Sequence, residues 1–105
     1  MVKVASIDLG SNSTRMLIAD ITNGNITTIY KEHQVTRMAD KLSESKIISK
    51  EATKRVLKVL AGYFKTINKN NVENIQIVGT AALRDAKNSQ EITQLIEKKF
   101  GFEVD

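Results

Sequence analysis

The segment Val4 to Ile21, VASIDLGSNSTRMLIADI, contains two apolar runs separated by a short polar loop, Gly10-Ser11-Asn12-Ser13. Glycine and asparagine enter positive φ at little cost, so the loop predicts a tight reversal between two strands. Because the second apolar run resumes at once, the loop belongs to a β-hairpin and does not open a helix, as the phosphate loops of βαβ units do. No lysine follows Gly10, which excludes a Walker A loop.

The residue types in this loop suit an anion. Successive backbone N–H groups, together with the side chains of Ser11, Asn12 and Ser13, can converge on one phosphate. Asp8 stands just before the loop, and its charge would repel phosphate directly. We therefore expect Asp8 to hold a water or a Mg²⁺ that bridges to phosphate oxygens. The alternative is a loop that only reverses the chain.

The pattern outward from this hairpin predicts three antiparallel strands, a helix, a fourth strand and a second helix. Alternation along the third strand places Ile26, Thr28 and Tyr30 on one face. The polar stretch Thr36 to Ile48 is expected to be a mobile loop. The expected elements are strands over 2–9, 14–21, 26–35 and 75–78, a helix from an N-cap at Ser49 to Asn68, a second helix begun by a capping box of Asn88 and Glu91 and ended by Gly101, and the start of a fifth strand at 102–105.

Composition narrows the class of protein. The 105 residues, 41% hydrophobic, suit one small domain, and the absence of cysteine excludes disulfides and thiolate metal sites. There is no leader-like or membrane-length apolar run, so we expect a soluble cytoplasmic protein and no membrane partner. The net charge of +4 favours a polyanionic partner. Aromatic residues make up only 5%, which makes nucleic acid an unlikely one.

Two motifs together point to a known family. The string IDLGSNSTRMLIAD resembles the first phosphate-binding loop of the Ppx/GppA family, whose superfamily includes actin, sugar kinases and heat-shock chaperone ATPases. The segment Thr80 to Asn88, TAALRDAKN, resembles the signature segment of the same family. The resemblance implies an α/β, actin-like (ribonuclease H-like) fold. Residues 1–105 would be the N-terminal part of domain I, a mixed sheet in the order βββαβα cut off in its fifth strand.

The resemblance also implies a function. The full-length parent would be a hydrolase that releases terminal phosphate from polyphosphate or guanosine pentaphosphate with Mg²⁺. The catalytic glutamate and a second phosphate loop would lie beyond residue 105, so that this part alone would be inactive. Whether the parent is a homodimer is left open. The roles implied are catalytic for Asp8 and Arg84, metal binding for Asp8, and substrate binding for Gly10, Ser11, Asn12, Ser13, Arg15, Arg37 and Thr80.

The placement of Thr80 and Arg84 also follows from topology. A helical crossover makes the fourth strand parallel to its neighbour, and ligands bind at the carboxyl ends of parallel strands. Arg84 would offer a charged fork to phosphate oxygens, or else form a local ion pair with Asp85.

One segment departs from the family pattern. Relatives usually carry Arg-Leu-Gly-Glu-Gly-Leu where this chain has Arg37-Met38-Ala39-Asp40-Lys41-Leu42, without either glycine. This difference puts the backbone path of the loop, and the reach of Arg37, in question. Two other classes of function stay open from the residues alone. One is a kinase or ATPase lobe of the same superfamily, and the other is a basic, non-enzymatic module for polyanions.

Overall fold

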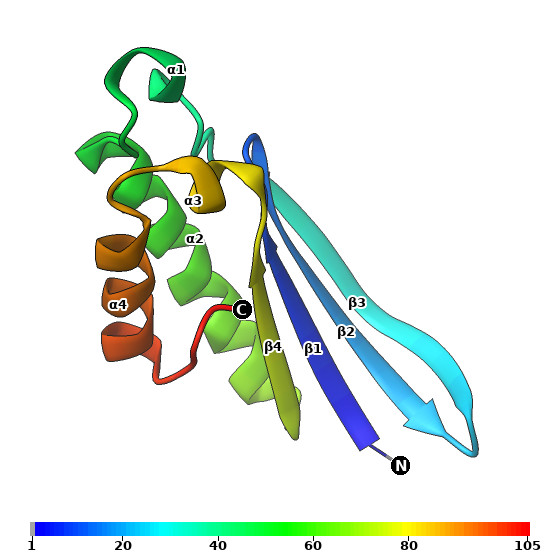
Figure 1. Cartoon of the computed structure of the whole chain (residues 1–105). Coiled ribbons are helices and arrows are strands. Elements are labelled where there is room, and N and C mark those ends of the chain that lie inside the picture. The colour runs from blue at the N-terminus through cyan, green and yellow to red at the C-terminus, as the bar shows by residue number, and fades with distance from the viewer. Residues whose placement is uncertain (1) are drawn as a thin grey trace.

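The computed structural model describes residues 2–105 and shows a four-stranded mixed sheet with its long helices on one face (Figure 1). The spatial order of the strands is β3-β2-β1-β4. β1 pairs with β2 in the antiparallel direction and with β4 in the parallel direction, as the helical crossover predicts. The elements are β1 (Val2–Leu9), β2 (Ser13–Thr22), β3 (Asn25–Val35), α1 (Leu42–Ser45), α2 (Lys50–Lys69), β4 (Asn74–Gly79), α3 (Ala81–Asp85) and α4 (Ser89–Phe100).

The last residues lie beside β4. Val104 forms a parallel bridge to Ile77, and the backbone of Asp105 donates to Ile77 and accepts from Gly79. The carboxyl end therefore lies beside β4 where a fifth strand would pair, as the pattern of residues 102–105 predicts, and Figure 1 shows it there as a coil.

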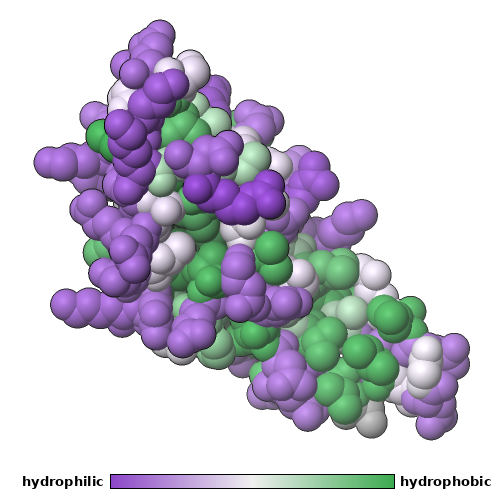
Figure 2. Space-filling model, in the orientation of Figure 1, coloured by the Kyte–Doolittle hydropathy of each residue, from purple (hydrophilic) through white to green (hydrophobic). Residues whose placement is uncertain are grey.

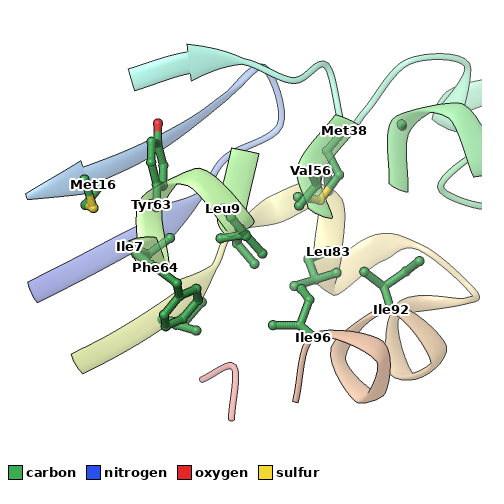
Figure 3. Packing of buried hydrophobic residues seen from close by; sticks show 14 of the residues in the cluster. Ile7, Leu9, Met16, Met38, Val56, Tyr63, Phe64, Leu83, Ile92 and Ile96 are labelled. Atoms are coloured by element: carbon green, nitrogen blue, oxygen red, sulfur yellow. The ribbon is translucent and has the colours of Figure 1, made fainter. Parts of the chain in front are cut away.

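The core lies between the sheet and α2 and α4. Alternate residues of β1, among them Ile7 and Leu9, point toward the helices, and α2 meets them with Tyr63 and Phe64 (Figure 3). Phe64 of α2 stacks on Phe100 at the end of α4, with ring centroids 4.8 Å apart. The helix begins where the sequence predicts, since the Ser49 side chain accepts a hydrogen bond from the backbone N–H of Ala52.

The predicted alternation along β3 is wrong beyond its middle. Tyr30 pairs with Ile18, while Thr28 pairs with the next residue, Ala19, so Ile29 is an extra residue in a β-bulge. Because a one-residue insertion exchanges the two faces of a strand, Tyr30 lies on the helix side of the sheet. Ile26 and Thr28 lie on the other face.

The segment from Thr36 to Ile48 is more ordered than the irregular loop that the sequence suggests. It contains the short helix α1, and the side chains of Thr36, Met38 and Ile48 are fully or almost fully buried. Met38 packs in the core near Val56 of α2 (Figure 3). Buried apolar side chains at both ends therefore anchor a stretch whose overall composition is polar.

Candidate phosphate-binding site

The β1–β2 loop is a two-residue reversal, Ser11-Asn12, closed by a 3.0 Å hydrogen bond from the backbone N–H of Gly10 to the carbonyl of Ser13. The reversal is as predicted, but the reason for the glycine is not. Neither Gly10 nor Asn12 has a positive φ. Instead, a Cβ on Gly10 would lie 2.7 Å from the Ser13 carbonyl oxygen, so the position needs a residue without a side chain.

The loop is held from the side by the segment after β3. The carbonyl of Asn12 accepts hydrogen bonds from the backbone N–H groups of Thr36, at 3.0 Å, and Arg37, at 2.9 Å. The carbonyl of Ser11 accepts from the N–H of Ala39, at 3.0 Å. Both loop carbonyls are thus turned toward residues 36–39. Within residues 2–105, the N–H groups of Ser11 and Asn12 donate to no other part of the chain.

A second set of hydrogen bonds joins the loop to the segment after β4. The hydroxyl and the backbone N–H of Thr80 both donate to the carbonyl of Leu9, at 3.0 and 3.1 Å. The backbone N–H of Ala82 donates to the hydroxyl of Ser11 over 3.3 Å. The structure therefore brings the loop, residues 36–39 and the start of α3 together at one end of the sheet (Figure 1).

Two buried hydrogen bonds, one of them from α2, support this cluster. The hydroxyls of Thr14 and Thr36 lie 2.9 Å apart and are fully buried, and the hydroxyl of Tyr63 donates to the carbonyl of Thr14 over 2.6 Å. Burial raises the pKa of Tyr63 to about 12, with a further contribution from the negative charge of Glu32. Tyr63 therefore remains a hydrogen-bond donor throughout the neutral range.

Asp8 leaves one oxygen without a partner. Its Oδ1 atom is buried and makes no hydrogen bond within residues 2–105. A buried carboxylate oxygen of this kind requires a donor or a cation, because leaving it unpaired costs free energy. No cluster of three or more acidic, histidine or cysteine side chains exists among residues 2–105. Mg²⁺ commonly binds one or two carboxylates and completes its shell with water and phosphate oxygens, so Asp8 alone fits one protein ligand of such an ion.

Arg15 is the cross-strand neighbour of Asp8, on the face of the sheet that the helices leave open. Its side chain is exposed, and it lines a hollow of about 680 Å³ together with Asp8, Lys31 and His33. Arg15 and Asp8 thus share one surface, although no ion pair joins them in the part of the chain that the structure describes.

Arg84 lies apart from Asp8. It is exposed on α3 and lines a different hollow, of about 450 Å³, with Gly79, Ser89 and Thr93. The ion pair with Asp85 that the sequence left open is absent among residues 2–105, where only Arg55 and Asp40 approach each other as an ion pair, at 3.9 Å. Arg37 is exposed beside the loop and has a φ of 50°.

The sequence reasoning missed two residues that hold the cluster together. Asn88 does not cap α4 as predicted, because its amide binds the backbone of Ile48, donating to the carbonyl and accepting from the N–H, both at 2.9 Å. Arg55 of α2 donates to the carbonyls of Thr36, at 2.8 Å, and Arg37, at 3.2 Å. Asn88 could have been found from the sequence, because it is the last residue of the signature segment TAALRDAKN. Arg55 gave no such signal, because it is one arginine within a lysine-rich helix.

Comparisons with known proteins agree with this geometry. The model of the Ppx/GppA phosphatase family matches residues 17–105. A guanosine-5'-triphosphate,3'-diphosphate pyrophosphatase of Aliivibrio fischeri is 43% identical over 84 residues, which are 80% of this chain and 17% of that protein. A Ppx/GppA family member of Aquifex aeolicus superposes with a TM-score of 0.96 at 33% identity, over 99% of this chain and 34% of the other. An exopolyphosphatase of Cytophaga hutchinsonii superposes with a TM-score of 0.94 at 26% identity, over 98% of this chain and 33% of the other.

The chain belongs to the Ppx/GppA phosphatase family. Its fold is the actin-like α/β fold of those structures, as the two motifs indicate. It spans about a third of the solved structures to which it is similar, and it matches their N-terminal part. None of the helices formed by residues 2–105 combines the length and the apolar character that crossing a bilayer requires.

Proposed function

We propose that this chain is the N-terminal part of the first domain of a hydrolase that releases terminal phosphate from polyphosphate or guanosine pentaphosphate. The observation that carries the proposal is the loop Gly10-Ser11-Asn12-Ser13, whose carbonyls are engaged by residues 36–39 while the N–H groups of Ser11 and Asn12 have no partner within residues 2–105. Similarity to an exopolyphosphatase and to a guanosine pentaphosphate pyrophosphatase supports the choice of substrates.

In this proposal the loop binds and orients the phosphate. The N–H groups of Ser11 and Asn12 and the exposed side chain of Asn12 donate to phosphate oxygens, and Ser13 and Gly10 shape the turn. Thr80 fixes the loop by donating to Leu9. Phosphoryl transfer to water depends mainly on positioning and charge neutralisation, which donors held in advance provide at little reorganisation cost.

The charged residues have separate roles. Arg37 adds positive charge beside the loop, and Arg84 adds positive charge from α3, whose first turn is joined to the loop by the hydrogen bond from Ala82 to Ser11. Arg15 adds charge on the open face of the sheet. Mg²⁺, when bound, would be held by Asp8 and would neutralise charge on the phosphate oxygens. The unpartnered oxygen of Asp8 supports this assignment.

The test is phosphate release from polyphosphate and from guanosine pentaphosphate, with Mg²⁺, by the whole protein that carries this chain. We expect Asn12→Ala and Arg84→Ala each to lower kcat/KM by about 10-fold to 1,000-fold with folding intact, by analogy with the removal of one donor that stabilises transition-state charge. Lys58→Ala, which removes an exposed charge from α2, is the control and leaves the rate unchanged. A wild-type protein that releases phosphate from neither substrate would contradict the proposal.

A further inference from the structure

Arg55 is a half-buried residue of α2 that contacts the segment after β3 through two backbone carbonyls and through a 3.9 Å ion pair with Asp40. Arg55 donates from Nε to the carbonyl of Thr36, at 2.8 Å, and from Nη2 to the carbonyl of Arg37, at 3.2 Å. A guanidinium group presents its donors in a rigid planar fork, so one side chain can hold two successive peptide groups in a fixed orientation.

The same two residues are also held from the other side. The N–H groups of Thr36 and Arg37 both donate to the carbonyl of Asn12 in the β1–β2 loop. Residues 36 and 37 therefore form a bridge, with their N–H groups on the loop and their carbonyls on Arg55. Any movement of this bridge moves the Asn12 carbonyl and with it Asn12 itself, whose N–H group the proposed function assigns to phosphate.

Arg37 needs such a constraint. Its φ of 50° lies in the left-handed region, which a residue with a Cβ enters only at a cost in free energy. Strained conformations persist when the surroundings determine them more strongly than local preference does. Arg55 provides such a constraint, because it holds the carbonyl of Arg37. The buried Thr14–Thr36 hydrogen bond fixes only the preceding residue, Thr36.

We propose that Arg55 is a positioning residue of the phosphate site. It fixes the backbone of Arg37, and through it the carbonyl of Asn12 in the β1–β2 loop, without contacting phosphate itself. This inference rests on the proposed function, because it assigns Arg55 to the same phosphate-binding loop. It differs from the simpler idea that Arg55 only adds positive charge near an anion.

The charge-matched variants separate these two ideas. Lys58 lines the same groove between α2 and β3 as Arg55 but makes no hydrogen bond to residues 36 and 37. Arg55→Lys keeps the charge and loses the fork, whereas Lys58→Ala loses a charge and keeps the fork. Arg55→Gln, a second neutral variant, retains a donor and serves if Arg55→Ala does not fold.

The first measurement is amide hydrogen exchange of the chain by NMR. We expect the N–H groups of Thr36 and Arg37 to exchange about 10-fold faster in Arg55→Ala than in wild type, since a hydrogen bond from a charged group is lost. Lys58→Ala should leave both rates unchanged. Equal rates in Arg55→Ala and wild type would overturn the inference.

The second measurement is the affinity of the same variants for tripolyphosphate. We expect Arg55→Ala to bind about 10-fold more weakly and Arg55→Lys about 3-fold more weakly, with Lys58→Ala within about twofold of wild type. In an Arg37→Ala background, Arg55→Ala should lose most of its effect, because the two residues act together.

The outcomes distinguish the two proposals. A wild-type chain that does not bind tripolyphosphate overturns the proposed function, and the inference with it. A wild-type chain that binds, with Arg55→Lys as tight as wild type or Lys58→Ala as weak as Arg55→Ala, overturns the inference alone.

Discussion

The two turns at the ends of β2 reverse the chain in different ways. At the far turn, Asn23 and Gly24 take φ values of 51° and 80°, and a Cβ on Gly24 would meet nothing within 4 Å. At the β1–β2 turn, Ser11 and Asn12 have no positive φ, and contacts from residues 36–39 and 80–82 surround them. The first turn is made by local conformational preference and the second by tertiary contacts.

The surroundings of the two turns match this difference. The β2–β3 turn extends past the helices at the far end of the sheet, and Figure 2 shows apolar surface gathered over the neighbouring strand ends. Ile26, next to that turn, is 72% exposed. The β1–β2 turn lies where β1, α3 and the segment after β3 meet. A turn held by several distant segments can keep unpaired N–H groups in place, which binding an anion requires.

The largest expected effect is the difference in stability between alanine substitutions at Gly10 and at Gly24. Gly10→Ala should destabilise the chain by about 3 kcal/mol, because the new Cβ overlaps a backbone oxygen that cannot move freely. Gly24→Ala should cost about 1 kcal/mol, the strain of a positive φ without any steric contact. Urea denaturation of both variants measures the difference. Equal costs at the two positions would show that both turns are governed locally.

The next largest effect is expected at Asn88, whose amide holds the backbone of Ile48. Asn88→Ala leaves the N–H and the carbonyl of Ile48 unpaired in a half-buried setting and should cost about 2 kcal/mol. Gln90→Ala, at an exposed position two residues further on, is the control and should cost less than about 0.5 kcal/mol. Thermal or urea unfolding measures both. A similar cost for the two variants would show that the Asn88–Ile48 hydrogen bonds do not stabilise the chain.

Tyr63 allows a test by pH. Tyr63→Phe should cost about 1 kcal/mol near neutral pH through loss of the hydrogen bond to Thr14. The pKa of Tyr63 is raised in the folded chain from 10.0 to about 12, so its contribution to stability is complete below pH 10 and is lost as the pH rises toward 12. The stability difference between wild type and Tyr63→Phe should therefore shrink between pH 10 and 12. A constant difference over that range would contradict the assignment.

The smallest expected effect concerns the segment without glycines. Lys41 has a φ of 61° at a position where the family pattern has glycine, whereas Ala39, at the other such position, has no positive φ. Lys41→Gly should therefore stabilise the chain by about 0.5 to 1 kcal/mol, while Ala39→Gly should destabilise it by a similar amount. Chemical denaturation measures both. A loss of stability in Lys41→Gly would mean that its side chain, and not its backbone, matters there.

Local patterns were enough to predict much of the fold. Ser49 and the helical spacing that follows it placed α2 within a residue at each end. The long crossover predicted that β4 would pair in parallel, and the structure shows that its partner is β1. These features follow from periodicity and capping, which nearby residues determine. The bulge at Ile29 was missed because alternation in sequence carries no signal for an inserted residue.

The two residues that hold the site together, Asn88 and Arg55, could not be predicted from the spacing of residues in the sequence. Asn88 matches a helix-capping pattern, yet its amide is used by Ile48, which lies 40 residues earlier. Arg55 has the sequence context of a solvated helix face, yet its guanidinium group holds two carbonyls of another segment. Both interactions depend on how distant elements pack, and the loop itself was found because its glycine, serine and asparagine residues are contiguous.

The most direct test of the central claim is a map of backbone amide shifts, by NMR, as tripolyphosphate is added to the chain with and without Mg²⁺. We predict that the shifts concentrate on residues 10–13, with smaller ones at Arg37 and Thr80 and none at the Asn23-Gly24 turn, and that Asn12→Ala removes most of them. Shifts that follow the exposed lysines of α2, or that affect both turns equally, would contradict the claim that the β1–β2 loop binds phosphate.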